Sequence, residues 1–363
     1  MKRILSRAAA VLGVAAVFAC CGITSFAQEE AGYIESVVEQ SIQQNPDVIL
    51  SGLELEKSDA EIEKLKRELG DLKDESSYSQ FEVQTLEAQI HYGELLADIS
   101  HKNMLDEKTI EIKKAYYDYL YSTEKVKLMQ KSLDTAKELL EQAIVKLDAG
   151  YISKFEYEQV EMSFRQKEIE LEKAAIDMES TGYGLNILVG EDFKGEVEIL
   201  NGAFEIEGFD LESVSVDEII EYIGSSDYFL LSLEKTTEIS RIDYQKSLSY
   251  YTDINLDTKI KKAQYEKNAF NLENAMKTLE KELAEELAVL KLSAREIGME
   301  AEEVEHQQKK YSAKVKEYES GYATILDVEN EYMALESKQL DYFSKVYKYN
   351  ISLMNFKEKY NID

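Results

Sequence analysis

Histidine, cysteine and carboxylate side chains most often carry catalysis or bind metals, and this chain has 3 histidines, 2 cysteines and 72 acidic residues. His91, His101 and His306 form no HxxxH pair and lie in charged segments, so we expect them at the surface rather than on a zinc ion. Acidic residues recur all along the chain, and no two of them stand apart as a catalytic pair. We therefore expect no metal and no cofactor.

Motifs for nucleotide binding and for covalent catalysis are missing as well. The segment GYGL at residues 182–185 lacks both the third glycine and the preceding strand of a phosphate-binding loop, and there is no GxSxG turn. Cys20 and Cys21 lie in or beside an N-terminal leader, so a mature chain cut after Ala27 would have no thiol. We expect that the protein is not an enzyme.

The net charge is strongly negative. The chain has 42 Lys and Arg against 72 Asp and Glu, a formal charge of −30. Without the three basic residues of the leader the difference is 39 − 72 = −33. This charge argues against nucleic acid, or an anionic membrane surface, as the ligand, because both would be repelled. It suits either an ordinary helical surface or a negatively charged duct that favours cations, and composition does not decide between them.

One short pattern occurs twice in the chain. GYISKFEYE at residues 150–158 returns as GYATILDVE at residues 321–329, which is 321 − 150 = 171 positions later. Each copy has a glycine suited to the left-handed end of a helix, a hydroxyl that can cap the next helix, and an acid that completes a capping box. The pattern predicts a sharp tip between two helices. Its residues are Gly150, Ser153 and Glu156 in the first copy, and Gly321, Thr324 and Asp327 in the second.

Long helices flank each of these tips. The chain has 1 proline and 16 glycines, and its apolar residues recur every three or four positions along segments 105–147, 157–188, 283–318 and 325–356. This 3.5-residue period is typical of coiled coils, and a helix of about 50 residues would span roughly 75 Å. The sequence therefore predicts an all-α fold of long antiparallel helical hairpins, arranged as two tandem repeats.

Further elements precede each hairpin. Segments 34–72 and 216–248 are predicted to be helical, with breaks at QQNPD, which contains Pro46, and at GSSD. The stretches YSQFEVQT and YYTDINL alternate with a period of two, which suits a short strand or an extended crossover. The expected organisation is a signal peptide at 1–27, a first helical repeat at 28–190, a linker at 191–214 and a second helical repeat at 215–363.

The N-terminus has the features of an export signal. Lys2, Arg3 and Arg7 precede the apolar run AAAVLGVAAVFA, and SFA before Gln28 is a small-residue cleavage site. The run is shorter than the roughly 20 residues that a membrane-spanning helix needs, and no other stretch approaches that length without charges. VFAC alternatively forms a poor lipoprotein box acylated at Cys20, and both kinds of processing remain open.

These features together resemble the outer-membrane efflux protein family, the TolC-like proteins. The resemblance runs from about Tyr33 to Tyr360 and is carried by the early QQNPDV, by the tyrosine-rich block beginning KKAYYDYLY and by the closing block beginning KYSAKVKEY. Two tips of the form G-x-x-[ST]-x-x-[DE] in a duplicated chain complete it. Each piece alone is weak, but the combination is specific.

The resemblance implies a homotrimer whose twelve helices close into a hollow α-barrel, the exit duct of a tripartite efflux system. In that family the tips face the inner membrane and meet a periplasmic adaptor, which couples the duct to an ABC-type or proton-driven transporter. By this match the six tip residues would form the adaptor-docking surface.

One departure from the family limits this reading. Members of the family insert two membrane-spanning strands per repeat, and each strand needs about 9 to 11 residues. In this chain only about 15 residues around YSQFEVQT, and fewer around YYTDINL, are available for a pair of strands. We therefore expect no transmembrane strands, and we expect the protein in the cell envelope outside the cytoplasmic membrane. The alternative function is an extracytoplasmic coiled-coil spacer or binding scaffold without transport.

Overall fold

The computed structural model describes residues 38–39, 41–74, 79–195, 197 and 208–362. The signal peptide with Cys20 and much of the predicted linker lie outside these residues. Within them the chain forms no strand, so the predicted all-α fold is confirmed. The helices are α2 (Pro46–Asp74), α3 (Gln80–Asp148), α4 (Lys154–Val189), α5 (Val216–Ser226), α6 (Tyr228–Tyr250), α7 (Leu256–Glu319) and α8 (Ile325–Tyr360).

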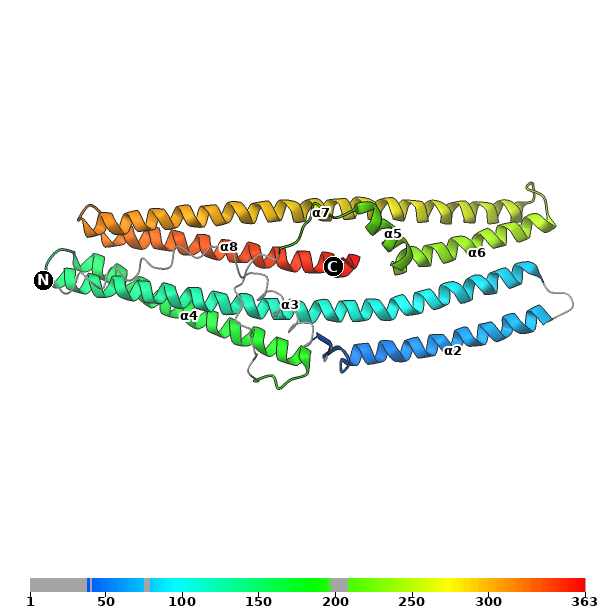
Figure 1. Cartoon of the computed structure of the whole chain (residues 1–363), viewed down its shortest axis with the longest axis horizontal. Coiled ribbons are helices and arrows are strands. Elements are labelled where there is room, and N and C mark those ends of the chain that lie inside the picture. Colours follow the sequence, from blue (N-terminus) through cyan, green and yellow to red (C-terminus); the bar gives the residue numbers. More distant parts are fainter. Residues whose placement is uncertain (1–37, 40, 75–78, 196, 198–207, 363) are drawn as a thin grey trace.

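Two very long helices organise the molecule. Helix α3 has 69 residues and α7 has 64, which at 1.5 Å per residue makes each roughly 100 Å long. Each packs against two shorter helices placed end to end, α2 and α4 along α3, and α6 and α8 along α7 (Figure 1). The two halves join where α3 packs against α6 and α8. The result is an elongated layer of helices.

The short strand, one of the two alternatives predicted for YSQFEVQT and for YYTDINL, is wrong for both. YSQFEVQT is helical from Gln80 onward, because the apolar residues Val83 and Ile90 continue the seven-residue spacing of α3 and are buried. YYTDINL forms the turn between α6 and α7, where the Asn255 side chain accepts a hydrogen bond from the Asp257 backbone N–H at 2.8 Å. The helix that was predicted to span about 50 residues is α3, and it is longer than predicted. The seven-residue spacing extends it back to Gln80, well before residue 105.

The predicted helix breaks are confirmed. Helix α2 begins at Pro46, whose missing N–H costs nothing in the first turn of a helix. Between α5 and α6 the Asp227 side chain accepts a hydrogen bond from the Leu230 backbone N–H at 2.8 Å and so caps α6. Both breaks let the chain bend without leaving the helical layer.

The apolar core is a chain of clusters along the layer rather than a single centre. The cluster in the middle of the molecule joins α5, α7 and α8, and its fully buried residues include Leu283, Val346 and Leu353. Further clusters join α3 to α4, and α3 and α4 to α8. A last cluster lies beneath the two hairpin tips. Each cluster includes residues of the seams that the 3.5-residue period predicts, namely Leu283, Ile112, Met129 and Val160 in turn.

None of the described helices combines the length and the apolar character that crossing a bilayer requires.

Candidate functional site: the paired hairpin tips

Both copies of the repeated pattern lie at the same end of the molecule. The tip between α3 and α4 and the tip between α7 and α8 are side by side at the left in Figure 1, and the first residues of α3 and of α7 lie at the opposite end. The two tips therefore present one composite surface, although 171 positions separate them in the sequence.

Each tip glycine adopts the predicted left-handed conformation, with φ of 76° at Gly150 and 81° at Gly321. In the first tip the Tyr151 backbone N–H donates to the Lys146 carbonyl at 2.8 Å. In the second the Tyr322 N–H donates to the Glu317 carbonyl at 2.8 Å. These six-residue closures end both long helices in the same way, because glycine adopts a left-handed φ without the backbone strain that a side chain adds.

The predicted capping boxes are both present. The Ser153 hydroxyl accepts from the Glu156 N–H at 3.2 Å while the Ser153 N–H donates to the Glu156 carboxylate at 2.7 Å. Thr324 and Asp327 form the same pair of bonds, at 3.2 Å and 2.8 Å. The backbone N–H of Ser153, and then its hydroxyl, lower the pKa of Glu156. The equivalent groups of Thr324 lower the pKa of Asp327.

One apolar cluster, here called the tip core, supports the two tips together. Because it draws on both hairpins, neither tip can move independently of the other without exposing apolar surface. The Lys146 ammonium of α3 also lies 3.5 Å from the centre of the Tyr318 ring of α7. The buried residues of the tip core are Leu139, Ala143, Val160, Tyr318, Ile325 and Val328.

Two tyrosines that the sequence interpretation did not single out are the most prominent side chains of the tips. Tyr151 is 82% exposed and Tyr322 is 88% exposed, and each follows a tip glycine. Phe155, in the first turn of α4, is also largely exposed. The signal was present in the repeated Gly-Tyr, since both tyrosines fall outside the helical seams and so have no core to fill. Exposed aromatic residues are enriched where proteins bind one another.

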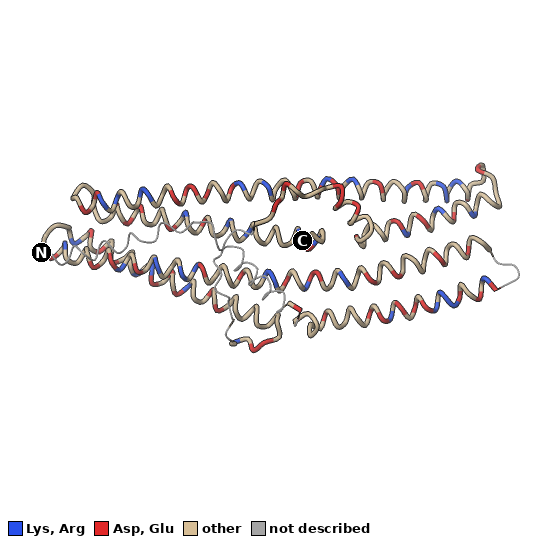
Figure 2. The backbone as a smooth tube through the Cα atoms, viewed as in Figure 1, with Lys and Arg blue, Asp and Glu red and all other residues tan. Residues whose placement is uncertain are grey.

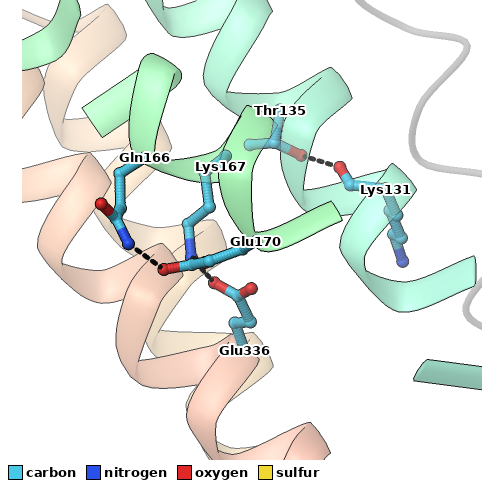
Figure 3. Close-up of polar contacts among 6 residues, drawn as sticks. All are labelled: Lys131, Thr135, Gln166, Lys167, Glu170 and Glu336. Carbon is cyan, nitrogen blue, oxygen red and sulfur yellow. Dashed lines mark hydrogen bonds and ion pairs between the residues drawn. The ribbon is translucent and has the colours of Figure 1, made fainter. Parts of the chain in front are cut away.

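A buried ion pair joins the two hairpins further from the tips. The Lys167 ammonium of α4 lies 2.5 Å from a Glu336 carboxylate oxygen of α8, and only 5% of the Glu336 side chain is exposed (Figure 3). The same ammonium contacts Glu170 at 2.8 Å, and Gln166 donates to Glu170 at 3.0 Å. Burial acts to lower the pKa of Lys167, but its bonds to Glu170 and Glu336 raise it overall, so the lysine remains charged.

Polar contacts between the repeats continue toward the middle of the molecule. Lys113 of α3 pairs with Glu358 of α8, and Tyr347 of α8 donates to Asp118 of α3. Burial and the neighbouring Asp118 carboxylate raise the pKa of Tyr347. These contacts hold α8 against α3 in one register, because polar groups in a packed interface favour the arrangement that pairs them.

The described part of the chain offers no obvious place for chemistry. No group of three or more His, Cys, Asp or Glu side chains there could hold a metal ion. Acidic and basic residues are interspersed along the long helices α3 and α7 (Figure 2). The arrangement is suited to making contacts, through the tips and through the borders of the layer.

Solved structures share this fold over most of the chain. A membrane protein from Pseudomonas aeruginosa matches with a TM-score of 0.70 and 11% identity, over 90% of this chain and 93% of that chain. The Campylobacter jejuni CmeC outer membrane channel matches with a TM-score of 0.65 and 13% identity, over 90% and 85%. The open state of the Neisseria gonorrhoeae MtrE outer membrane channel matches with a TM-score of 0.64 and 12% identity, over 90% and 88%.

Comparisons of the sequence with known families give no such match. No family model matches the chain, and neither does any curated protein. At 10–13% identity the structural similarity establishes the fold alone. The chain thus has the TolC-like fold, and the resemblance indicated by its repeated tips and helix pattern is confirmed at the level of the fold.

Proposed function

We propose that this protein is an exported efflux component of the cell envelope, a TolC-like helical duct that docks an adaptor protein through its paired tips. The observation that carries the proposal is the pair of tips: two turns of the same geometry, at one end of the molecule, each presenting an exposed tyrosine. The channels of the same fold support the duct, and the adaptor in turn would link it to an inner-membrane transporter of the ABC type or another pump.

The tips suit docking because they are rigid before a partner arrives. Both capping boxes and both glycine closures are formed, and the tip core holds the two turns together. A partner that binds Tyr151 and Tyr322 therefore orders little additional chain, which reduces the entropic cost of association. The six tip residues predicted from the sequence shape this surface, and the two tyrosines supply its contact area.

Exposed apolar residues on α4 support assembly into a ring. They recur at intervals of seven positions and so form one stripe along the helix. Helix α4 lies along one border of the layer for most of its length and α7 along the other (Figure 1). A contact between two different borders is head-to-tail, and it forms a ring when the rotation between neighbouring copies closes on itself. We propose three copies in the ring, the number that the family resemblance implies. The residues of this α4 stripe are Phe155, Met162, Ile169, Ile176 and Tyr183.

The α7 border has apolar residues that suit the other side of this contact. Val289, Leu292 and Met299 are each more than half exposed. A contact between copies that buries both the α4 stripe and these α7 residues would remove apolar surface from water. Each Å² of buried apolar surface would stabilise the assembly by about 25 cal/mol. The ring would enclose a passive duct, in which an acidic lining would favour cations.

Docking is tested by site-specific cross-linking in the native host. A photo-reactive amino acid at position 151 or 322 should capture an adaptor protein, which mass spectrometry would identify and from which a transporter would co-purify. The double variant Tyr151→Ser, Tyr322→Ser should lose most of this capture in a milder chemical cross-link. Both positions are exposed, so the fold should be unaffected.

The matched control is Tyr251→Ser, which removes an exposed tyrosine at the opposite end of the molecule and should leave capture unchanged. Recovery of the protein alone, or of cell-wall material alone, would contradict the efflux function and favour the coiled-coil spacer.

A further inference from the structure

The corner where α6 meets α7 has an open cavity that adaptor docking does not use. It lies at the right-hand extremity of the molecule in Figure 1, far from the tips. Its volume is about 340 Å³, within the range of roughly 300 to 1,000 Å³ that is typical of sites for small molecules. Here it is called the corner cavity, and its lining includes Lys246, Tyr250, Tyr251, Asp257, Ile260 and Lys261.

Polar bonds beside the corner cavity fix its shape. The Ser247 and Thr258 hydroxyls share a buried hydrogen bond of 2.8 Å, which ties the last turn of α6 to the first turn of α7. The Asn255 side chain accepts a hydrogen bond from the Asp257 backbone N–H at 2.8 Å and so caps α7. Because these bonds form without a ligand, binding would order little additional chain.

Two neighbouring aromatic rings supply much of the apolar wall. Tyr250 is 67% exposed and Tyr251 is 56% exposed, and Ile260 beside them is 66% exposed. All three side chains therefore remain largely in solvent, and the core does not need them. Exposed apolar groups that line a cavity and that the fold does not need mark a site of interaction.

Hydrogen-bonding groups of both kinds accompany the rings. The Lys261 ammonium can donate and the Asp257 carboxylate can accept. Among the residues that the structure describes, neither of these two groups has an ion pair or a side-chain hydrogen bond. A ligand rich in hydroxyls could pair with both groups, because a hydroxyl both donates and accepts.

The charge around the corner cavity is balanced. Lys246 pairs with Glu82 at 3.4 Å, and Lys262 pairs with Glu266 at 3.6 Å. The other two lysines of residues 246–262 stand against two aspartates, a balance of 2 − 2 = 0. A phosphate or another strongly charged ligand would meet no excess of opposite charge, so a neutral ligand fits the cavity better.

A neutral oligosaccharide combines the properties that this cavity selects. Each pyranose ring has an apolar face of C–H groups, which can pack on the negative face of an aromatic ring. Its rim of hydroxyls can pair with groups such as Asp257 and Lys261. A wholly apolar ligand fits less well, because it would cover these polar groups without pairing them. Two successive tyrosine rings suit two linked sugar units.

We propose that the corner cavity binds a neutral oligosaccharide, with pyranose faces on Tyr250 and Tyr251 and with hydroxyls paired to Asp257 and Lys261. The inference does not rest on adaptor docking, because it concerns the other end of the molecule and is tested on the purified protein alone.

The test uses the fluorescence of a single tryptophan. The chain has no tryptophan, so Tyr251→Trp introduces one indole at the corner cavity and keeps an aromatic ring there. Titration of this full chain with maltotetraose or with chitotetraose should change the emission until it saturates. Saturation by maltotetraose would assign a glucan as the ligand, and saturation by chitotetraose alone would assign a glycan of N-acetylated sugars.

Two further changes in the Tyr251→Trp chain identify the contacts. Tyr250→Ala should weaken binding about tenfold, because it removes a stacking surface. Asp257→Ala should weaken it about fivefold, because it removes a charged acceptor. The matched control is Tyr322→Ala, which removes an 88% exposed tyrosine at the tips and should leave the affinity unchanged. No saturable change with either sugar, or unchanged affinity in both cavity variants, would overturn the proposal.

A second measurement leaves both tyrosines in place. In saturation-transfer NMR of the unmodified chain, the ring C–H protons of the bound sugar should receive magnetisation, and Tyr250→Ala with Tyr251→Ala should abolish the transfer. Added sodium chloride should not change the affinity, because the ligand is neutral. Displacement of the sugar by inorganic phosphate would show that the cavity is an anion site and would contradict the proposal.

Discussion

Three glycines share one unusual backbone conformation, and they offer a controlled comparison at the residue scale. Gly150, Gly321 and Gly190 have φ between 76° and 81°, and a Cβ at any of them would meet no atom within 4 Å. Alanine at each should lower the free energy of unfolding by about 1 kcal/mol, because only the left-handed strain is added. Urea unfolding of the three variants would measure this cost.

Adaptor capture should separate the same three variants. Gly150→Ala and Gly321→Ala should reduce capture, because they disturb the docking surface, whereas Gly190→Ala at the end of α4 should not. Equal capture by all three, despite equal losses of stability, would show that the tip glycines only terminate helices.

The two capping-box acids predict a dependence of the tips on pH. The pKa values of Glu156 and Asp327 are lowered in the folded protein, so their contribution is complete above the ordinary pKa values of about 4.3 and 3.9. It is lost as the pH falls through the lower folded values. Hydrogen exchange of the Ser153 and Thr324 amides, corrected for intrinsic rates, should lose protection in that acidic range. Glu156→Gln should abolish the change at Ser153, and an unaltered profile would contradict the assignment.

At the scale of the elements, the Lys167–Glu336 pair should matter far more than the exposed pairs around it. Lys167→Met would leave Glu336 buried without its cation, at a cost of about 3 kcal/mol in the free energy of unfolding. Adding Glu336→Leu should restore most of that loss, because an apolar pair replaces the lone charge.

Lys338→Met is the matched control for this pair. It breaks a pair of α8 with Glu303 of α7 in which both side chains are at least 40% exposed, and it should cost less than about 1 kcal/mol. A double-mutant cycle by urea unfolding measures both cases. Similar losses of unfolding free energy in Lys167→Met and Lys338→Met would mean that water reaches the Lys167–Glu336 pair.

The α4 stripe leads to a prediction at the scale of the whole molecule. Ile169→Glu with Ile176→Glu would place two charges in the ring contact and should shift the protein from a trimer to a monomer, since buried charges without partners are strongly unfavourable. Mass photometry of the purified chain would follow the shift. Ile254→Glu, an equally drastic change outside the stripe, should leave assembly intact, and loss of the trimer in that variant alone would place the contact elsewhere.

The division into repeats and linker remains a prediction at this scale, and so do the location in the envelope and the choice between signal cleavage and acylation at Cys20. The fold supports a duct, but transport itself is tested only through the partners that the tips capture.

The sequence alone determined the features that depend on residues a few positions apart. The seven-residue spacing, the glycine at each helix end and the hydroxyl with an acid three residues later specify helices, closures and capping boxes through local sterics and hydrogen bonds. Each was therefore predictable. The strand prediction at YSQFEVQT failed because a short alternation is weaker than the helical seam of Val83 and Ile90, which a reading from residue 105 missed.

Only the tertiary structure decided which distant groups meet. It brings the two tips together across 171 positions and pairs Lys167 with Glu336. No local pattern specifies these outcomes, because a lysine on a long helix has the same backbone preferences whether or not another helix covers it. The packing of α3 and α4 against α7 and α8 decides which distant side chains meet. That packing depends on the sum of many seam contacts rather than on any one motif.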